Sequence, residues 1–86
     1  MHVAAEFFGL EDVELIRSKR RRGQISHARY ALAHVLIEDA GWSTLQVGRL
    51  INKDHSAVVL GRRKAGMLLR HDPVFFGALE HLREAM

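Results

Sequence analysis

The chain contains no cysteine and only one proline in 86 residues. Without cysteine, a disulfide framework, a thiol nucleophile and a thiolate metal site are all excluded, and the composition suits a reducing cytoplasm. No stretch approaches the roughly 20 apolar residues that a membrane span requires. The first residues lack the charged-then-apolar layout of a signal peptide. The length predicts a single domain over residues 1–86, too short for an ATPase or a two-lobed enzyme.

Motifs that carry catalysis or bind metal are also missing. The six histidines include no His-x-x-x-His pair and no His-Glu-x-x-His motif, so no metal site is expected. Gly61 and Gly66 have the glycine spacing of a phosphate loop, but Met67 and Leu68 stand where that motif needs lysine and serine or threonine. No serine lies in a nucleophile elbow. We therefore expect no enzyme activity and no cofactor.

Acidic residues are scarce where the basic residues concentrate. Twelve of the 13 lysines and arginines fall in two blocks, and Asp54 is the only acid inside either. Such segregation predicts a positive face and a polyanionic partner. The two blocks are Arg17, Lys19, Arg20, Arg21, Arg22 and Arg29, followed by Arg49, Lys53, Arg62, Arg63, Lys64 and Arg70.

The apolar pattern predicts an all-α fold of about six helices. Apolar residues recur at spacings of three and four between capping residues and glycines. In the longest helix, Ala28, Leu32 and Val35 belong to a buried stripe, with Arg29 on a different side and Ser26 as the N-cap. The expected helices cover residues 3–8, 11–18, 26–40, 43–51, 54–69 and 72 onward, and the last of them is expected to begin with Asp72 as its N-cap and Pro73 at its first position.

A helix-turn-helix is predicted at the centre of the chain. Ser43 and Gln46 form a capping-box pattern, and Asp54 is a good N-cap for the next helix. Only two residues separate these helices, which is typical of a helix-turn-helix. Residues 55–57, in the first turn of the second helix, are short or polar and suit a DNA major groove. The alternative is a capped surface helix with solvated arginines.

Residues 19–24 form a second candidate DNA contact, which we call the basic loop. Four successive cations repel one another and add nothing to a core, and Gly23 is expected to keep helix out of this loop. The functional interpretation is a flexible arm that reaches phosphates or enters a minor groove, where the negative potential attracts arginine. The alternative is a solvated charge run.

Nearly the whole chain resembles the C-terminal DNA-binding domain of the bacterial replication initiator DnaA. Lys53-Asp-His-Ser56, then Val58 and Arg63-Lys64, resembles the signature Arg-Asp-His-Thr-Thr-Val and its trailing Arg-Lys. Ala57 stands where the signature has its second threonine. The remaining matches are Val3-Ala-Ala-Glu-Phe-Phe-Gly with the opening helix, Ser18-Lys-Arg-Arg21 with the basic loop, Arg29 with a basic position early in the long helix, and Val47-Gly48 with the Ile-Gly of the first helix-turn-helix helix.

The resemblance implies a monomer that binds an asymmetric duplex site in the bacterial nucleoid. The base-contacting residues in the major groove would be Asp54, His55, Ser56 and Ala57. The minor-groove residues of the basic loop would be Lys19, Arg20, Arg21 and Arg22. The phosphate-contacting residues would be Arg29, Lys53, Arg62, Arg63 and Lys64.

The expected function is sequence-specific binding of double-stranded DNA. The family's ATPase module is not in this sequence. The chain would therefore act by occupying DNA sites, as a transcription regulator or a modulator of replication initiation. The sequence leaves open whether the chain is a fragment or a complete protein, and whether it comes from a host or a phage. Two alternatives remain. One is a protein-interaction module that docks through Phe75, Phe76 and Leu79, motivated by the aromatic density of the last helix. The other is a non-specific nucleoid or RNA binder.

Overall fold

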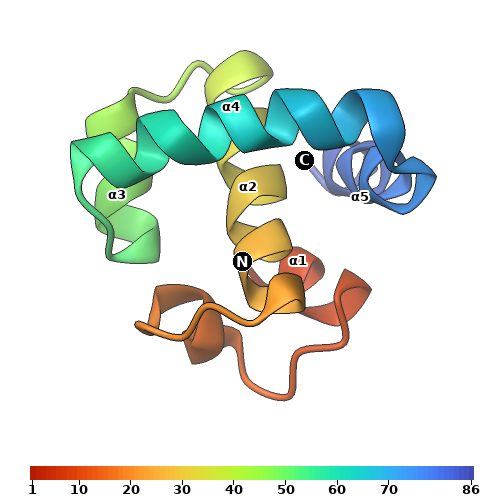
Figure 1. Cartoon of the computed structure of the whole chain (residues 1–86), viewed down its shortest axis with the longest axis horizontal. Helices are drawn as coiled ribbons and strands as arrows, with labels where there is room; N and C mark the ends of the chain where they lie inside the picture. The colour runs from red at the N-terminus through yellow and green to blue at the C-terminus, as the bar shows by residue number, and fades with distance from the viewer.

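The computed structural model describes residues 1–86 and is entirely helical, as the apolar pattern predicts. Five α-helices and one 3-10 helix form a globule of 27 × 26 × 23 Å (Figure 1). No helix combines the length and the apolar character needed to cross a membrane. The elements are α1 (His2–Phe7), η1 (Val13–Arg17), α2 (Gly23–Glu38), α3 (Thr44–Ile51), α4 (His55–His71) and α5 (Pro73–Glu84).

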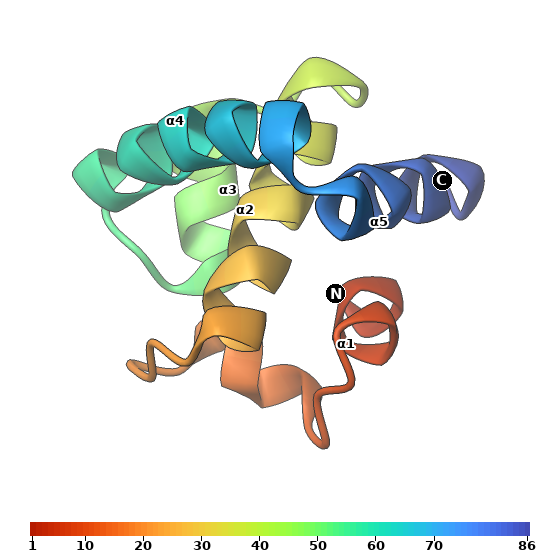
Figure 2. The same cartoon turned by 45° about the vertical axis from the view of Figure 1, so that its right-hand side comes forward.

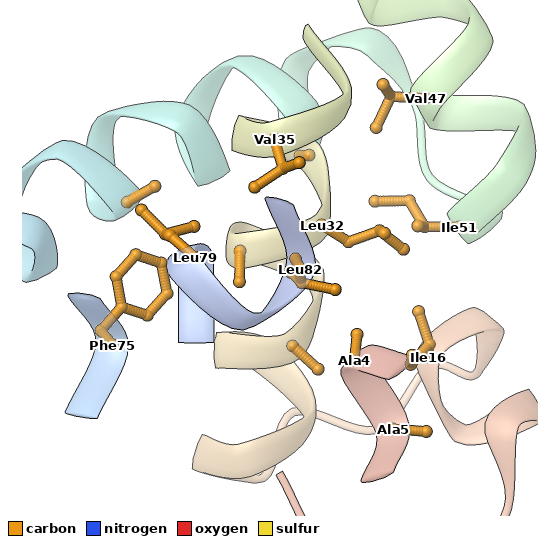
Figure 3. Packing of buried hydrophobic residues seen from close by; sticks show 14 of the residues in the cluster. Ala4, Ala5, Ile16, Leu32, Val35, Val47, Ile51, Phe75, Leu79 and Leu82 are labelled. Carbon is orange, nitrogen blue, oxygen red and sulfur yellow. The ribbon is translucent and has the colours of Figure 1, made fainter. Parts of the chain in front are cut away.

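Helix α2 is the central element of the fold. It packs against each of the other helices, and α4 crosses in front of it in Figure 1, with α3 and α5 on either side. The predicted stripe is buried, since Ala28, Leu32 and Val35 are all at most 5% exposed. Figure 3 shows core side chains from α1, η1, α3 and α5 gathered around this stripe. The core thus packs α1 and α5, at the two ends of the chain, and the α3–α4 pair against α2.

Three predicted helix caps are confirmed. Ser43 and Gln46 make both hydrogen bonds of a capping box at the start of α3. Asp54 caps α4, and its Oδ1 accepts from the backbone N–H of Ala57 at 2.8 Å. Asp72 caps α5 ahead of Pro73 and accepts from two backbone N–H groups. These signals are local in sequence, and they position α3, α4 and α5 as expected.

Other local expectations are wrong. Helix α2 begins at Gly23 with Arg22 as its N-cap, so Ser26 is not the cap and Gly23 does not break the helix. The second predicted helix is a short 3-10 turn, η1, rather than an α-helix. The non-helical part of the basic loop is therefore only four residues long, Lys19 to Arg22, and its end is fixed by α2.

The aromatic face predicted on the last helix is also wrong. Phe75 and Leu79 are completely buried, and Figure 3 shows both within the core. Phe76 is 50% exposed, and Val74 is exposed beside it. A docking surface built from Phe75, Phe76 and Leu79 together is thus excluded, because two of the three side chains stabilise the fold.

Candidate nucleic-acid interface

The first turn of α4 presents its side chains to solvent. His55, Ser56 and Ala57 are all exposed, and none is covered by another element. The turn before them is tight because Asn52 adopts a left-handed conformation, with φ 59°, which asparagine tolerates better than most residues. At Gly48, a Cβ would lie 2.6 Å from the Lys53 carbonyl oxygen, so the glycine lets α3 approach the turn. Val58 of α4 is farther away, with its Cγ2 3.6 Å from the same Cβ position, so the close approach at Gly48 is made mainly with the turn.

Hydrogen bonds attach this turn to the end of η1 and to Ser18, the residue before the basic loop. Arg17 Nε donates to the Leu50 carbonyl at 3.0 Å, and Asn52 Nδ2 donates to the Arg17 carbonyl at 3.3 Å. Lys53 Nζ donates to the Ser18 carbonyl at 2.9 Å. Both views of the fold place the loop between η1 and α2 on the same side as the start of α4 (Figures 1 and 2). The basic loop and the start of α4, which are the two predicted DNA contacts, therefore lie in one region of the molecule. The Lys53–Ser18 hydrogen bond, next to both, joins residues 35 positions apart in sequence.

Arg29 does not lie where the sequence analysis expected. It is only 6% exposed, and its guanidinium donates to backbone carbonyls instead of facing solvent. Nε bonds the Ile16 carbonyl at 2.7 Å, Nη1 bonds the Arg20 carbonyl at 2.7 Å, and Nη2 bonds the carbonyls of Ser18 and, at 3.2 Å, Leu15. The phosphate role expected for Arg29 is therefore replaced by a structural one, in which Arg29 holds the loop onto α2.

A groove runs between the basic loop, α2 and α4; we call it the α2–α4 groove. Its volume is about 220 Å³, and its lining includes Arg21, Lys53, Ala57, Leu60 and Lys64. Tyr30 forms part of its wall, and the Lys64 ammonium lies 5.8 Å from the centre of the Tyr30 ring. The groove thus combines cations from the loop, the turn and α4 with the exposed first turns of α4.

The cations of the chain differ in whether they form an ion pair with an acid. Arg17, Arg62 and Arg83 form ion pairs, whereas the cations of the loop, the turn and the groove form none. Arg62 pairs with Glu38, at the opposite end of α2 from the basic loop, so its predicted phosphate contact is not supported. The unpaired cations of the loop, the turn and the groove are Lys19, Arg20, Arg21, Arg22, Lys53 and Lys64, and Arg63, the neighbour of Lys64 on α4, is also exposed and unpaired.

The electrostatics around Lys53 are those of crowded positive charge. Desolvation is the main effect that lowers the pKa of Lys53, followed by repulsion from Arg29, Arg21 and Lys19, while Asp54 opposes the shift. In contrast, hydrogen bonding to Asp39 raises the pKa of Arg83 at the other side of the molecule. A bound anion near Lys53 would relieve this repulsion, since opposite charges within a few ångströms favour the charged form.

Three residues of this region were not singled out by the sequence patterns. Thr44, the first residue of α3, has its Oγ1 3.0 Å from Nδ1 of His55. Leu60 is 52% exposed and follows Ser56 by one helical turn, so it shares that face of α4. Helical spacing from Ser56 was the available signal for Leu60. Tyr30 and Thr44 depend on packing between helices, for which the sequence carries no local signal.

Comparison of the chain with protein-family models, curated proteins and solved structures gave no match. No three histidine, aspartate or glutamate side chains lie close enough together to hold a metal ion. The geometry and charge of the α2–α4 groove and its surroundings are therefore the features from which a function can be inferred.

Proposed function

We propose that this chain binds double-stranded DNA in a sequence-specific manner. In this proposal α3, the turn and α4 act as a helix-turn-helix, and the start of α4 enters a major groove. Asp54, His55, Ser56 and Ala57 contact base edges there, where donor and acceptor patterns distinguish all four base pairs. The basic loop enters the adjacent minor groove, whose negative potential attracts arginine.

The observation that carries the proposal is the attachment of the basic loop to the turn before α4. Lys53 Nζ and the guanidinium of Arg29 both donate to the carbonyl of Ser18, the residue before the basic loop, so the turn and α2 share one acceptor at the start of the loop. The exposed start of α4 and the unpaired cation Arg21 thereby border the same groove. A loop fixed in this way supports simultaneous contact with two neighbouring grooves of one duplex, because it cannot swing freely away from α4.

Charge supports the same proposal. Most of the unpaired lysines and arginines lie in the loop, the turn and the groove, whereas Arg62 and Arg83 form ion pairs with acids elsewhere on the molecule. Neutralising five phosphates would release counterions, giving a slope of roughly −4.5 for log affinity against log salt. A flat salt response would contradict a duplex-binding function. Phosphate contacts are assigned to Lys53, Arg63 and Lys64, with Arg29 and Arg62 removed from the set.

We further propose that the domain is related to the DNA-binding domain of the replication initiator DnaA. The support is the Asp-His-Ser sequence at the start of α4 and the basic Ser-Lys-Arg-Arg stretch, which lie on the same side of the molecule. In this proposal the chain acts by occupying its site, as a transcription regulator or a modulator of replication initiation.

In-vitro selection from a random duplex pool tests the proposal directly. We expect enrichment of one asymmetric motif, bound by a monomer at least about a thousandfold more tightly than unrelated DNA. Binding of all sequences with similar affinity would instead indicate a non-specific nucleic-acid binder. Absence of binding at moderate salt would exclude both.

Two substitutions separate the roles of the loop and of α4. Arg21→Ala should weaken binding most on sites with A/T-rich flanks, because a narrow minor groove concentrates negative potential. Arg70→Ala is the matched control, since it removes the same charge from an exposed position in the last turn of α4. His55→Ala should cost about 1–3 kcal/mol on the selected site and little on random DNA. Equal losses on both would show that His55 does not read bases.

A further inference from the structure

The start of α4 is hydrogen-bonded to the start of α3. Thr44 Oγ1 lies 3.0 Å from His55 Nδ1, although the two residues are 11 positions apart. Both residues occupy the first position of their helices. Each backbone is fixed by a cap, the Ser43–Gln46 capping box in one case and Asp54 in the other. The hydrogen bond therefore joins the starts of two helices whose backbones are fixed, and it constrains the side chains of Thr44 and His55.

A histidine ring needs such a constraint if it is to recognise one base. Rotation about its second side-chain torsion is soft and roughly two-fold, so an exposed imidazole exchanges the positions of its nitrogens and carbons. A hydrogen bond at Nδ1 selects one orientation and leaves Nε2 as the nitrogen available to another partner. The protonation of Nε2, and hence its role as donor or acceptor, is then coupled to the direction of the Thr44 bond.

Resting on the proposed function, we propose that Thr44 is a positioning residue that determines which base His55 reads. The Thr44 hydroxyl holds the imidazole so that Nε2 is the atom presented to a base edge in the major groove. Thr44 itself makes no base contact in this proposal. Specificity at one base pair therefore depends on a residue of α3 that acts through His55.

The first test compares Thr44→Val with Thr44→Ser. Valine keeps the shape and removes the hydroxyl, whereas serine keeps the hydroxyl. We expect Thr44→Val to reduce the preference at one base pair by roughly three- to tenfold, the range for freeing one immobilised side chain. The same base pair should lose its preference in His55→Ala. Affinity for random DNA should not change, and Thr44→Ser should retain the wild-type preference.

Three results would overturn the inference. Thr44→Val could select the same motif as the wild type with the same strength. Thr44→Val and Thr44→Ser could lose affinity equally at every position, which would indicate a purely structural role. The wild type could enrich no motif, in which case the proposed function fails as well.

The second test needs no DNA and so separates the inference from the proposed function. Nitrogen-15 spectra of the histidine rings report the hydrogen bonding and tautomer of each imidazole. We expect the Nδ1 signal of His55 to move in Thr44→Val and to stay near its wild-type position in Thr44→Ser, with the other five histidines unaffected. An unchanged His55 signal in Thr44→Val would show that the hydrogen bond does not position the ring.

Discussion

Replacing Arg29 with lysine distinguishes a structural role from a phosphate contact. The substitution keeps the positive charge on α2 and changes only the geometry of the donors. Arg29 uses all three guanidinium nitrogens, at Ile16, at Arg20, and at Leu15 together with Ser18. A lysine ammonium is one nitrogen on a flexible stem and cannot reproduce this planar arrangement. A residue that only attracted phosphate would tolerate the change well.

The expected loss of stability follows from these hydrogen bonds. A hydrogen bond to a charged group contributes about 1.5–3 kcal/mol, and one ammonium can replace at most part of the set. Because the loop is exposed and water can reach some of its carbonyls, we expect a loss of about 2–4 kcal/mol from Arg29→Lys. A domain of this size has a total stability on the order of 4–13 kcal/mol. The melting temperature should therefore fall by roughly 10–25 °C.

Urea and thermal unfolding followed by circular dichroism measure this loss. Arg22→Lys is the control, because Arg22 is exposed in the same loop and its side chain makes no hydrogen bond; its stability should change by less than about 0.5 kcal/mol. An Arg29→Lys variant as stable as the wild type would refute the structural role. Burial lowers the pKa of Arg29, but arginine remains charged at neutral pH, so the result does not depend on titration.

Further substitution tests concern two glycines, a half-buried histidine and the last helix. Gly48→Ala should destabilise the protein by about 1–3 kcal/mol, because the added Cβ would lie 2.6 Å from the Lys53 carbonyl oxygen. Gly66→Ala should instead stabilise it by up to about 1 kcal/mol, because the added Cβ meets open space. Urea unfolding measures both changes. Desolvation is the largest effect that lowers the pKa of His34, so the unfolded chain binds the proton more tightly than the folded chain. The free energy of unfolding should therefore fall as the pH drops below about 6.5. The fall should be smaller in His34→Gln, which cannot bind this proton. Phe76→Asp should change stability by less than about 0.5 kcal/mol, whereas Phe75→Asp should prevent folding by placing a charge in the core, as circular dichroism would show.

The sequence predicts well those parts of the fold that depend on neighbouring residues. The caps at Ser43, Asp54 and Asp72 involve side chains and backbone groups within three residues, so their patterns alone identify them. The central stripe of α2 follows from helical periodicity. The start of α2 at Gly23 could not be found in this way, because it is not marked by a side-chain cap and depends on how Arg29 holds the preceding loop.

The site is predictable to a similar extent. The exposure of His55 and Ser56 follows from their place in a capped first turn. Arg29 was misplaced because helical spacing gives the direction of a side chain and not the presence of a loop that covers it. The Thr44–His55 hydrogen bond was missed for a related reason, since it depends on how α3 and α4 pack.

The central claim is that the start of α4 and the basic loop contact neighbouring grooves of one duplex. Because the chain lacks cysteine, Ser56→Cys and Arg22→Cys can each carry a single iron–EDTA group that cleaves nearby DNA. On the selected site, we predict cleavage in a major groove from position 56 and in the adjacent minor groove from position 22, with centres roughly five base pairs apart, half a helical turn. Cleavage without a fixed position from either label, or cleavage from only one of them on a bound duplex, would contradict the account.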